Sequence, residues 1–273
     1  MTVHVKKYSI EGTAYHYRSQ GEGEALVFLH GFTGSSQTWE PFVDTWKESY
    51  HVITIDLPGH GLTKGNADLS MQEVCRHLAI LFNYLNIETC HLIGYSMGGR
   101  TALSFAMWYP EYITSLILES ASPGLRTEAE RIDRVKKDHQ LASRIRQEGM
   151  KSFVDYWETI PLFDTQKKLP LSIRQNIRKE RLQQTEEGLA TSLTSIGTGS
   201  QPSWWNKLTT LAIDVCLIVG EKDIKFVQIN EQMHAQITES ELHIVPEAGH
   251  AVHIEQPTPF HHLVEYFIQK NSK

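Results

Sequence analysis

The stretch His91-Leu92-Ile93-Gly94-Tyr95-Ser96-Met97-Gly98 decides the fold of this 273-residue chain. An apolar strand pattern runs into the motif G-x-S-x-G, and a helical pattern begins directly after it. Such a turn presents a serine hydroxyl at the end of a strand, and its glycines leave room that side chains would fill. The motif alone arises by chance, but with a strand before it and a helix after it we predict an exposed, strained nucleophile at Ser96.

Short β-rich runs surround this motif and alternate with helical patterns at residues 71–86 and 97–109. Alternation of this kind predicts a mainly parallel sheet that is covered by helices on both faces. The first two runs, residues 3–10 and 13–18, meet at Glu11-Gly12 and predict an antiparallel hairpin at the sheet edge. The other expected strands are residues 25–29, 51–55, 90–93, 115–119, 214–219 and 241–245.

Residues 121–210 interrupt this rhythm, because they contain helical stretches rich in Arg, Lys, Gln and Glu but no convincing strand. Thr127 and Glu130 form a capping-box pattern that starts one of these helices. A closing helix is expected from about residue 258. A helical insertion between two strands predicts a cap over the carboxyl edge of the sheet, where such folds bind ligands. We therefore expect a core of residues 1–120 and 211–273 and a cap of residues 121–210.

Two further side chains complete a candidate catalytic set with Ser96. A serine hydroxyl needs a neighbouring base to take its proton. Asp223 and His250 each follow a late predicted strand, so both should lie at the same edge as Ser96. The chain order serine, acid, histidine is that of the α/β-hydrolase fold. The sequence thus predicts this fold, with a mostly parallel eight-stranded sheet and a helical cap inserted before the last strands; Glu221 is an alternative to Asp223 as the acid.

The loop His30-Gly31-Phe32 follows the expected strand at residues 25–29. In this fold, that loop and the residue after the nucleophile supply two backbone N–H groups to an oxyanion hole, here those of Phe32 and Met97. We interpret His30 as a side chain that fixes the loop. We interpret the later turn Asp56-Leu57-Pro58-Gly59-His60-Gly61 as structural.

Composition excludes several other classes of protein. The net charge of -6 argues against a general nucleic-acid binder, and no apolar run is long enough to cross a membrane. The first ten residues resemble a strand more than a signal peptide, so we expect a cytoplasmic protein. The three cysteines are scattered in apolar runs and are expected to be buried thiols. We expect no metal or cofactor, and the sequence indicates no particular oligomeric state.

Positive charge is concentrated in the insertion and beside the candidate nucleophile. Residues 121–200 hold 14 of the 26 Lys and Arg but only 11 of the 32 Asp and Glu. Arg100 lies four residues after Ser96, so both should face the same side of the helix. Arg100 could be solvated, but beside a nucleophilic serine we favour carboxylate binding. The cap pairs Arg131/Arg134 and Arg178/Arg181 are either exposed helix faces or part of the same anionic pocket.

Nearly the whole chain resembles the 2-succinyl-6-hydroxy-2,4-cyclohexadiene-1-carboxylate (SHCHC) synthases of menaquinone biosynthesis, which are α/β-hydrolase-fold lyases. The resemblance is carried by the residue 94–100 motif with its Gly99-Arg100 ending, by Glu119-Ser120-Ala121-Ser122-Pro123-Gly124-Leu125, and by Gly220-Glu221-Lys222-Asp223-Ile224-Lys225-Phe226. It implies catalytic roles for Ser96, Asp223 and His250. The substrate-binding residues that it implies are Tyr95, Arg100, Arg134, Trp157, Arg181 and Lys225; Arg126, Arg131 and Arg178 compete for the cap positions, and Trp157 could equally be core packing.

The resemblance also implies a reaction. Such enzymes eliminate pyruvate from 2-succinyl-5-enolpyruvyl-6-hydroxy-3-cyclohexene-1-carboxylate, a small molecule with three carboxylates. Two other functions remain open from the residues: a carboxylesterase or carbon–carbon bond hydrolase with the same triad, and a binding module that has kept it. The arginines argue against a neutral ester pocket, and an intact triad argues against a module without turnover.

Overall fold

The computed structural model describes residues 5–64 and 69–272 and contains one eight-stranded sheet. Its strand order is β1-β2-β4-β3-β5-β6-β7-β8. The strands are Lys6–Ile10 (β1), Thr13–Gln20 (β2), Ala25–Leu29 (β3), His51–Ile55 (β4), Cys90–Tyr95 (β5), Ile113–Glu119 (β6), Asp214–Gly220 (β7) and Ser240–Val245 (β8). All eight predicted strands are present to within a few residues; positions 3 and 4 of the first lie outside the described residues.

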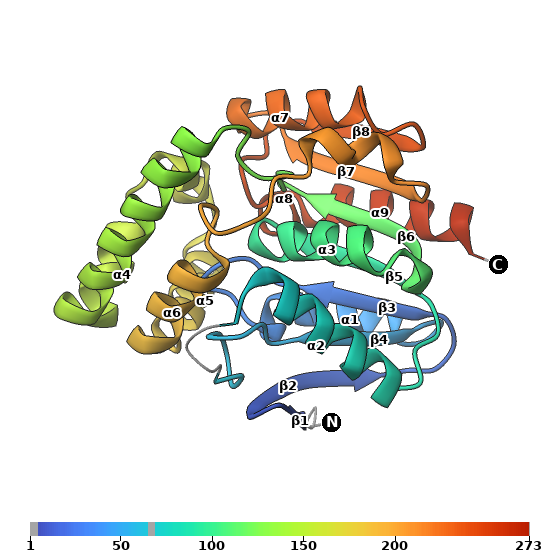
Figure 1. Cartoon of the computed structure of the whole chain (residues 1–273), viewed down its shortest axis with the longest axis horizontal. Helices are drawn as coiled ribbons and strands as arrows, with labels where there is room; N and C mark the ends of the chain where they lie inside the picture. The colour runs from blue at the N-terminus through green and yellow to red at the C-terminus, as the bar shows by residue number, and fades with distance from the viewer. Residues whose placement is uncertain (1–4, 65–68, 273) are drawn as a thin grey trace.

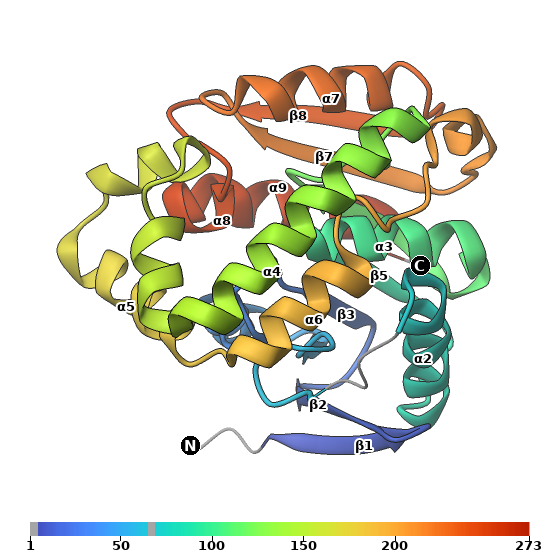
Figure 2. The ribbon, with the colours of Figure 1, turned by 60° about the vertical axis from the view of Figure 1, so that its left-hand side comes forward.

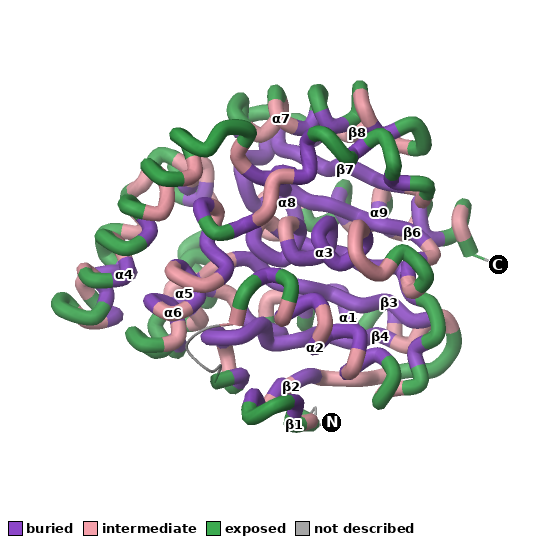
Figure 3. The backbone as a smooth tube through the Cα atoms, in the orientation of Figure 1, coloured by how far each residue is buried: buried purple, intermediate pink, exposed green. Residues whose placement is uncertain are grey.

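Strand direction follows from the connections. β1 pairs with β2 across the predicted hairpin, in which Ile10 faces Thr13, and the two turn residues Glu11 and Gly12 have the positive φ angles that such a turn requires. β2 also runs antiparallel to β4, whereas β4, β3, β5, β6, β7 and β8 run parallel to one another. The central strands are buried along their whole length (Figure 3), as expected for parallel strands covered on both faces.

Helices cover both faces of this sheet (Figure 1). Apolar residues of α2 (Met71–Tyr84), α3 (Met97–Trp108) and α7 (Ile224–His234) form one core with the first face. Those of α1 (Glu40–Trp46), α8 (Val252–Glu255) and α9 (Pro257–Asn271) form a second core with the other face.

Residues 120–213, all of which are described, contain no strand. They form α4 (Glu128–Trp157), α5 (Leu171–Leu182), α6 (Glu186–Ile196) and the 3-10 helices η3 (Pro161–Lys168) and η4 (Trp205–Thr210). α4 begins at the predicted capping box, in which Thr127 accepts from the Glu130 N–H, and it bends at Gly149, where φ is 79°. α4 and α6 pack together through their own apolar cluster and cross the carboxyl edge of the sheet (Figure 2).

Polar contacts join this helical segment to the core. Glu180 on α5 accepts hydrogen bonds from the hydroxyls of Ser35 (2.7 Å) and Thr38 (2.8 Å), and burial raises the pKa of its carboxyl group. Gln184 accepts from the Gly61 N–H at 2.9 Å.

No helix in the described part of the chain is long and apolar enough to cross a membrane.

Candidate active site

Ser96 lies at the turn between β5 and α3 with φ of 50° and ψ of −105°, a backbone conformation that non-glycine residues rarely adopt. Two glycines make the turn possible. A Cβ at Gly94 would lie 2.5 Å from the Gly98 carbonyl oxygen, and one at Gly98 would lie 2.1 Å from the Leu29 carbonyl oxygen. The G-x-S-x-G pattern therefore reflects close backbone contacts, which hold the serine at the end of the strand.

Three side chains from distant parts of the sequence meet at this turn. His250 Nε2 lies 2.9 Å from Ser96 Oγ, and His250 Nδ1 lies 2.6 Å from Asp223 Oδ2. The histidine and the aspartate are almost completely buried, and Asp223 caps the start of α7. With Nδ1–H donating to Asp223, Nε2 is free to accept the Ser96 proton, which is the arrangement that activates a serine.

The alternative acid, Glu221, lies elsewhere. Its side chain is half exposed, accepts from the Glu247 N–H at 3.2 Å and pairs with Lys222. The loops after β7 and β8 pack so closely that a Cβ at Gly220 would lie 2.1 Å from the Gly249 carbonyl oxygen. This contact brings the Asp223 loop against the His250 loop, so the structure puts Asp223 and not Glu221 beside the imidazole.

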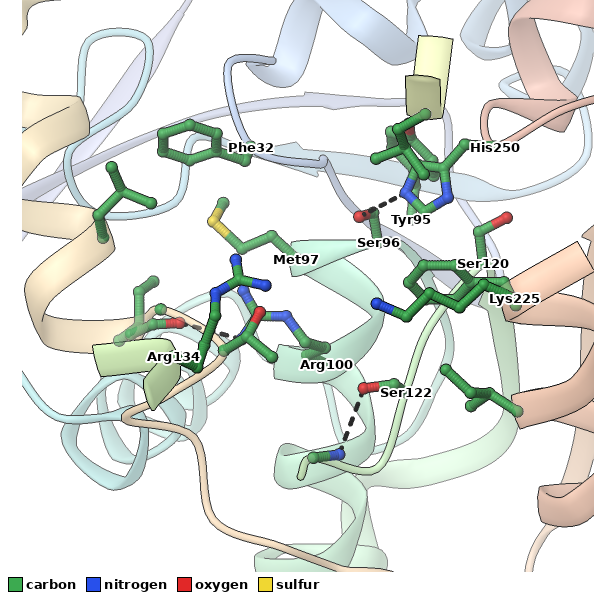
Figure 4. A pocket seen from close by; sticks show the side chains of 18 of the residues that line it. Phe32, Tyr95, Ser96, Met97, Arg100, Ser120, Ser122, Arg134, Lys225 and His250 are labelled. Carbon is green, nitrogen blue, oxygen red and sulfur yellow. Dashed lines mark hydrogen bonds between the residues drawn. The ribbon is translucent and has the colours of Figure 1, made fainter. Parts of the chain in front are cut away.

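The loop after β3 reaches the other side of Ser96 (Figure 4). His30 holds its shape: its buried ring donates from Nδ1 to the Gly31 carbonyl (2.8 Å) and accepts at Nε2 from the Leu57 N–H (3.0 Å). Burial lowers the pKa of this imidazole, which matches its acceptor role as a neutral ring. Phe32 follows in the same loop, and the Met97 N–H opens α3, where no intrahelical acceptor exists. Both predicted oxyanion positions thus border the nucleophile.

The predicted turn at residues 56–61 is held by Asp56. Its carboxylate accepts from the backbone N–H groups of Ser36 (2.6 Å) and Leu62 (2.9 Å). These bonds tie the turn to the start of η1 (Ser36–Trp39), next to the loop that carries Phe32. The turn therefore fixes the loops next to the site, as expected for a structural element.

A cavity of about 360 Å³ opens over Ser96 and His250, roofed by α4, η3 and α6. Three cationic side chains line it, Arg100, Arg134 and Lys225, and none of the described lining residues is an aspartate or glutamate. Figure 4 shows the three cationic groups directed toward the same space beside Ser96. Such a cavity suits an anionic ligand.

Arg100 forms no direct ion pair with a described carboxylate, although Asp138 lies close enough to interact with its charge. Its Nη1 donates to the Ile196 carbonyl (3.0 Å) and to the Gln201 side-chain oxygen (3.1 Å), both uncharged acceptors. Burial, and then the nearby charge of Arg134, lowers the pKa of this guanidinium to about 10, against the opposing effect of Asp138. A partly buried cation without a direct ion-pair partner is costly unless a ligand supplies the charge.

Several known proteins are similar to this chain. The model of the α/β-hydrolase-fold family matches residues 24–257. A Bacillus subtilis (strain 168) protein provisionally named SHCHC synthase is 45% identical over 263 residues, which cover 94% of this chain and 96% of that protein. A Salmonella heidelberg (strain SL476) SHCHC synthase is 34% identical over 248 residues, covering 89% and 93%. The solved structure of MenH from S. aureus has a TM-score of 0.91 at 35% identity and covers 95% of this chain and 99% of its own. The chain belongs to the SHCHC synthase family.

The SHCHC synthase resemblance also implied binding residues, and the structure brings most of them to the cavity. Tyr95, Arg134, Trp157 and Lys225 line it together with Arg100. Arg134 uses Nε to bind Asp138 (2.7 Å), which leaves its terminal nitrogens for other partners. The Trp157 ring lies against Phe32, and its indole N–H is buried without a hydrogen-bond partner among the described residues.

Arg181 differs from the other residues expected of an SHCHC synthase site. It is buried outside the cavity lining, its guanidinium lies over the Phe163 ring at 4.8 Å, and it contacts Glu158 (3.5 Å) and Gln166 (3.1 Å). Phe163 separates it from the cavity, so its assignment to substrate stays a prediction that requires Phe163 to move. The competing arginines are also engaged elsewhere: Arg126 with Trp205 and Gln232, Arg131 with Glu128, and Arg178 with Asp155 and Glu158.

Sequence reasoning gave no role to several residues of the site. Phe163 and Phe226 face the imidazole of His250 from η3 and α7. Ser192 and Leu193 of α6 also line the cavity. Glu119 and His253 form a buried pair behind Tyr95. Glu119 and Phe226 stood in quoted motifs, at the end of β6 and at the start of α7, but neither was given a role there.

Proposed function

We propose that this chain is an SHCHC synthase, a lyase that eliminates pyruvate from 2-succinyl-5-enolpyruvyl-6-hydroxy-3-cyclohexene-1-carboxylate. One observation carries the proposal beyond family membership: a serine–histidine–aspartate set opens into a cavity lined by three cations and no described carboxylate. The substrate carries three carboxylates, so its charge complements that of the cavity. The enzyme acts on a small molecule.

The reaction needs a base more than a nucleophile. In the proposed first step, His250, oriented by Asp223, accepts the Ser96 proton while Ser96 Oγ removes a ring proton beside the succinyl ketone. The carbon–hydrogen electron pair moves into an enolate, whose oxygen receives hydrogen bonds from the Phe32 and Met97 N–H groups. As the ketone re-forms, a new ring double bond forms, the existing one shifts, and the carbon–oxygen bond to enolpyruvate breaks with its electron pair on that oxygen. Enolpyruvate takes up one proton to become pyruvate, and His250 gives up the proton that it accepted, so the triad returns to its starting state. No water attacks and no acyl-enzyme forms.

Some of the binding residues would hold the substrate carboxylates, and others would form the wall of the cavity. We assign Arg100, Arg134 and Lys225 to the carboxylates, since a guanidinium can bind a carboxylate with two parallel hydrogen bonds. Tyr95 and Trp157 supply the walls, and the Trp157 N–H can donate to a substrate oxygen. Residues 121–210 would act as a cap that keeps water from the enolate, with residues 1–120 and 211–273 as the catalytic core.

The nearest alternative is a carboxylesterase or carbon–carbon bond hydrolase that uses the same triad. The cations disfavour a neutral ester, because Arg100 would then remain partly buried without a direct ion-pair partner. The two reactions also leave different products. Elimination adds a double bond to the ring, which creates a conjugated diene, whereas hydrolysis would leave the ring with its single double bond.

The deciding experiment incubates the purified protein with the enolpyruvyl substrate. Pyruvate release, measured with a coupled enzyme, should rise in step with the ultraviolet absorbance of the new diene. Both should appear in a one-to-one ratio. Pyruvate without diene would indicate hydrolysis, and neither product together with turnover of simple esters would replace this proposal with an esterase.

Removal of the unpaired cation should weaken recognition of the substrate. We expect Arg100→Ala to cost about 2–5 kcal/mol of transition-state binding, measured from kcat/KM, since it leaves a substrate carboxylate unpaired in the cavity. Arg131→Ala, which removes a partly exposed arginine paired with Glu128, is the matched control and should retain activity. An equal loss for a neutral ester substrate would count against carboxylate recognition.

A further inference from the structure

A second histidine–carboxylate pair lies behind the catalytic set. The side chains of Glu119 and His253 are 0% and 1% exposed. His253 Nδ1 lies 2.8 Å from both carboxylate oxygens of Glu119, and the backbone N–H of His253 donates to Glu119 Oε1 at 3.0 Å. The carboxylate therefore fixes the ring and the backbone of His253 together, across 134 residues of sequence.

Glu119 also contacts the nucleophile through its backbone. It is the last residue of β6, and its carbonyl oxygen accepts the Ser96 N–H at 2.8 Å. The chain turns sharply at the next residue, Ser120, where φ is 47° and the N–H binds the Ile218 carbonyl at 2.9 Å. Glu119 is thus held on both sides, by β5 with Ser96 at its end and by β7.

His253 lies three residues after His250, in the short helix α8. Its ring is packed between Trp39 (centroids 4.8 Å apart) and Tyr95 (4.6 Å). Tyr95 in turn contacts the ring of His250 at 5.5 Å. A shift of His253 would therefore be passed to His250 by the backbone and by Tyr95.

We propose that Glu119 and His253 are positioning residues that set the distance between His250 Nε2 and Ser96 Oγ. Glu119 joins the two halves of the catalytic set: its carbonyl holds the backbone of Ser96, and its carboxylate holds the segment that carries His250. This inference rests on the proposed roles of Ser96 and His250. Neither positioning residue lines the cavity over Ser96, so they act on the chemical step and leave substrate binding largely unchanged.

Packing alone does not explain the pair. A buried carboxylate is costly to desolvate, and apolar side chains of similar size usually stabilise an interior at least as well. His253 already lies among Trp39, Tyr95 and Phe260, which would accept an aromatic ring in its place. What an apolar pair cannot supply is the directional hydrogen bonding that sets the position of α8.

The test measures how fast a fluorophosphonate probe modifies Ser96, because this reaction needs the serine–histidine contact but not the natural substrate. We expect Glu119→Gln and the apolar double variant Glu119→Met/His253→Phe to slow labelling and kcat by about 10- to 100-fold, the usual effect of a misplaced catalytic group, with KM little changed. His253→Asn, whose amide N–H can replace Nδ1–H, should keep most of the wild-type labelling rate and kcat. His77→Asn is the control and should label like the wild type. His77 is a buried histidine on α2, and its ring contacts Tyr15 of β2.

Thermal melting accompanies each measurement, and the double variant keeps the test decisive if Glu119→Gln unfolds. A folded double variant that labels at the wild-type rate would overturn the proposal. So would a His253→Asn variant as slow as the double variant. If the enolpyruvyl substrate is not turned over by the wild type, the proposed synthase function fails, yet the labelling comparison still decides the role of Glu119 and His253.

Discussion

The Ser96→Ala variant is expected to release pyruvate about 10⁴- to 10⁶-fold more slowly than the wild type, the usual loss when a member of a catalytic triad is removed. The proposed mechanism gives Ser96 Oγ the only direct contact with the ring proton, while His250 acts through it at 2.9 Å. Alanine leaves a gap that the imidazole does not cross without moving. The measurement is kcat for pyruvate and diene formation at saturating substrate.

The size of the loss separates two roles for the serine. If His250 took the ring proton directly, Ser96→Ala would retain much of its activity, and a loss below about tenfold would contradict the role assigned to Ser96. Ser104→Ala provides the matched control. Ser104 is a buried serine on the same helix, but its hydroxyl accepts from the Trp204 indole at 2.9 Å, away from the cavity. Its activity should remain close to that of the wild type.

The sequence predicted the sheet well because its signals are local. Buried parallel strands are short continuous apolar runs bounded by turn residues, and each of these runs formed a strand. The turn that carries Ser96 was also predictable, since Gly94 and Gly98 are fixed by backbone contacts that no other residue type permits. Asp223 and His250 followed from one topological rule, that the carboxyl ends of parallel strands share an edge.

The helical segment of residues 120–213 shows which features local sequence patterns do not predict. Its helices were expected from their composition and from the capping box at Thr127, but a helix pattern does not say which side chain faces the cavity. Arg134 and Arg181 were equivalent in sequence terms. In the structure, α4 directs Arg134 into the cavity, whereas Arg181 is covered by Phe163 and held by Glu158.

Pairs that are distant in sequence were the least predictable. Glu119 and His253 lie on separate elements, and nothing near either residue marks the other as its partner. α1, with seven residues, and α8, with four, are too short for a helical period to stand out. Their positions are determined by tertiary packing, notably of Trp39, Trp46 and Phe260 in the second core. That packing also places the ring of His253 against Tyr95.

The Asp223→Asn variant should lower kcat about 10⁴-fold, because it changes which nitrogen of His250 carries the proton. In the wild type, His250 Nδ1 donates to Asp223 Oδ2 at 2.6 Å, so Nε2 presents a lone pair to Ser96. An asparagine amide can instead donate to Nδ1, which moves the ring proton to Nε2. The imidazole then cannot accept the Ser96 proton, although the three side chains keep their places. Pyruvate release and fluorophosphonate labelling of Ser96 should fall together.

Glu221→Gln is the matched control for this change, since it neutralises a carboxylate two residues away in the same loop. Glu221 is half exposed and binds Lys222 and the Glu247 N–H, so its replacement should leave kcat within about twofold, as expected for surface ion pairs. A large loss in Glu221→Gln with little loss in Asp223→Asn would reverse the assignment of the acid. The two residues differ in what their carboxylates contact, and that difference determines which of them orients the imidazole.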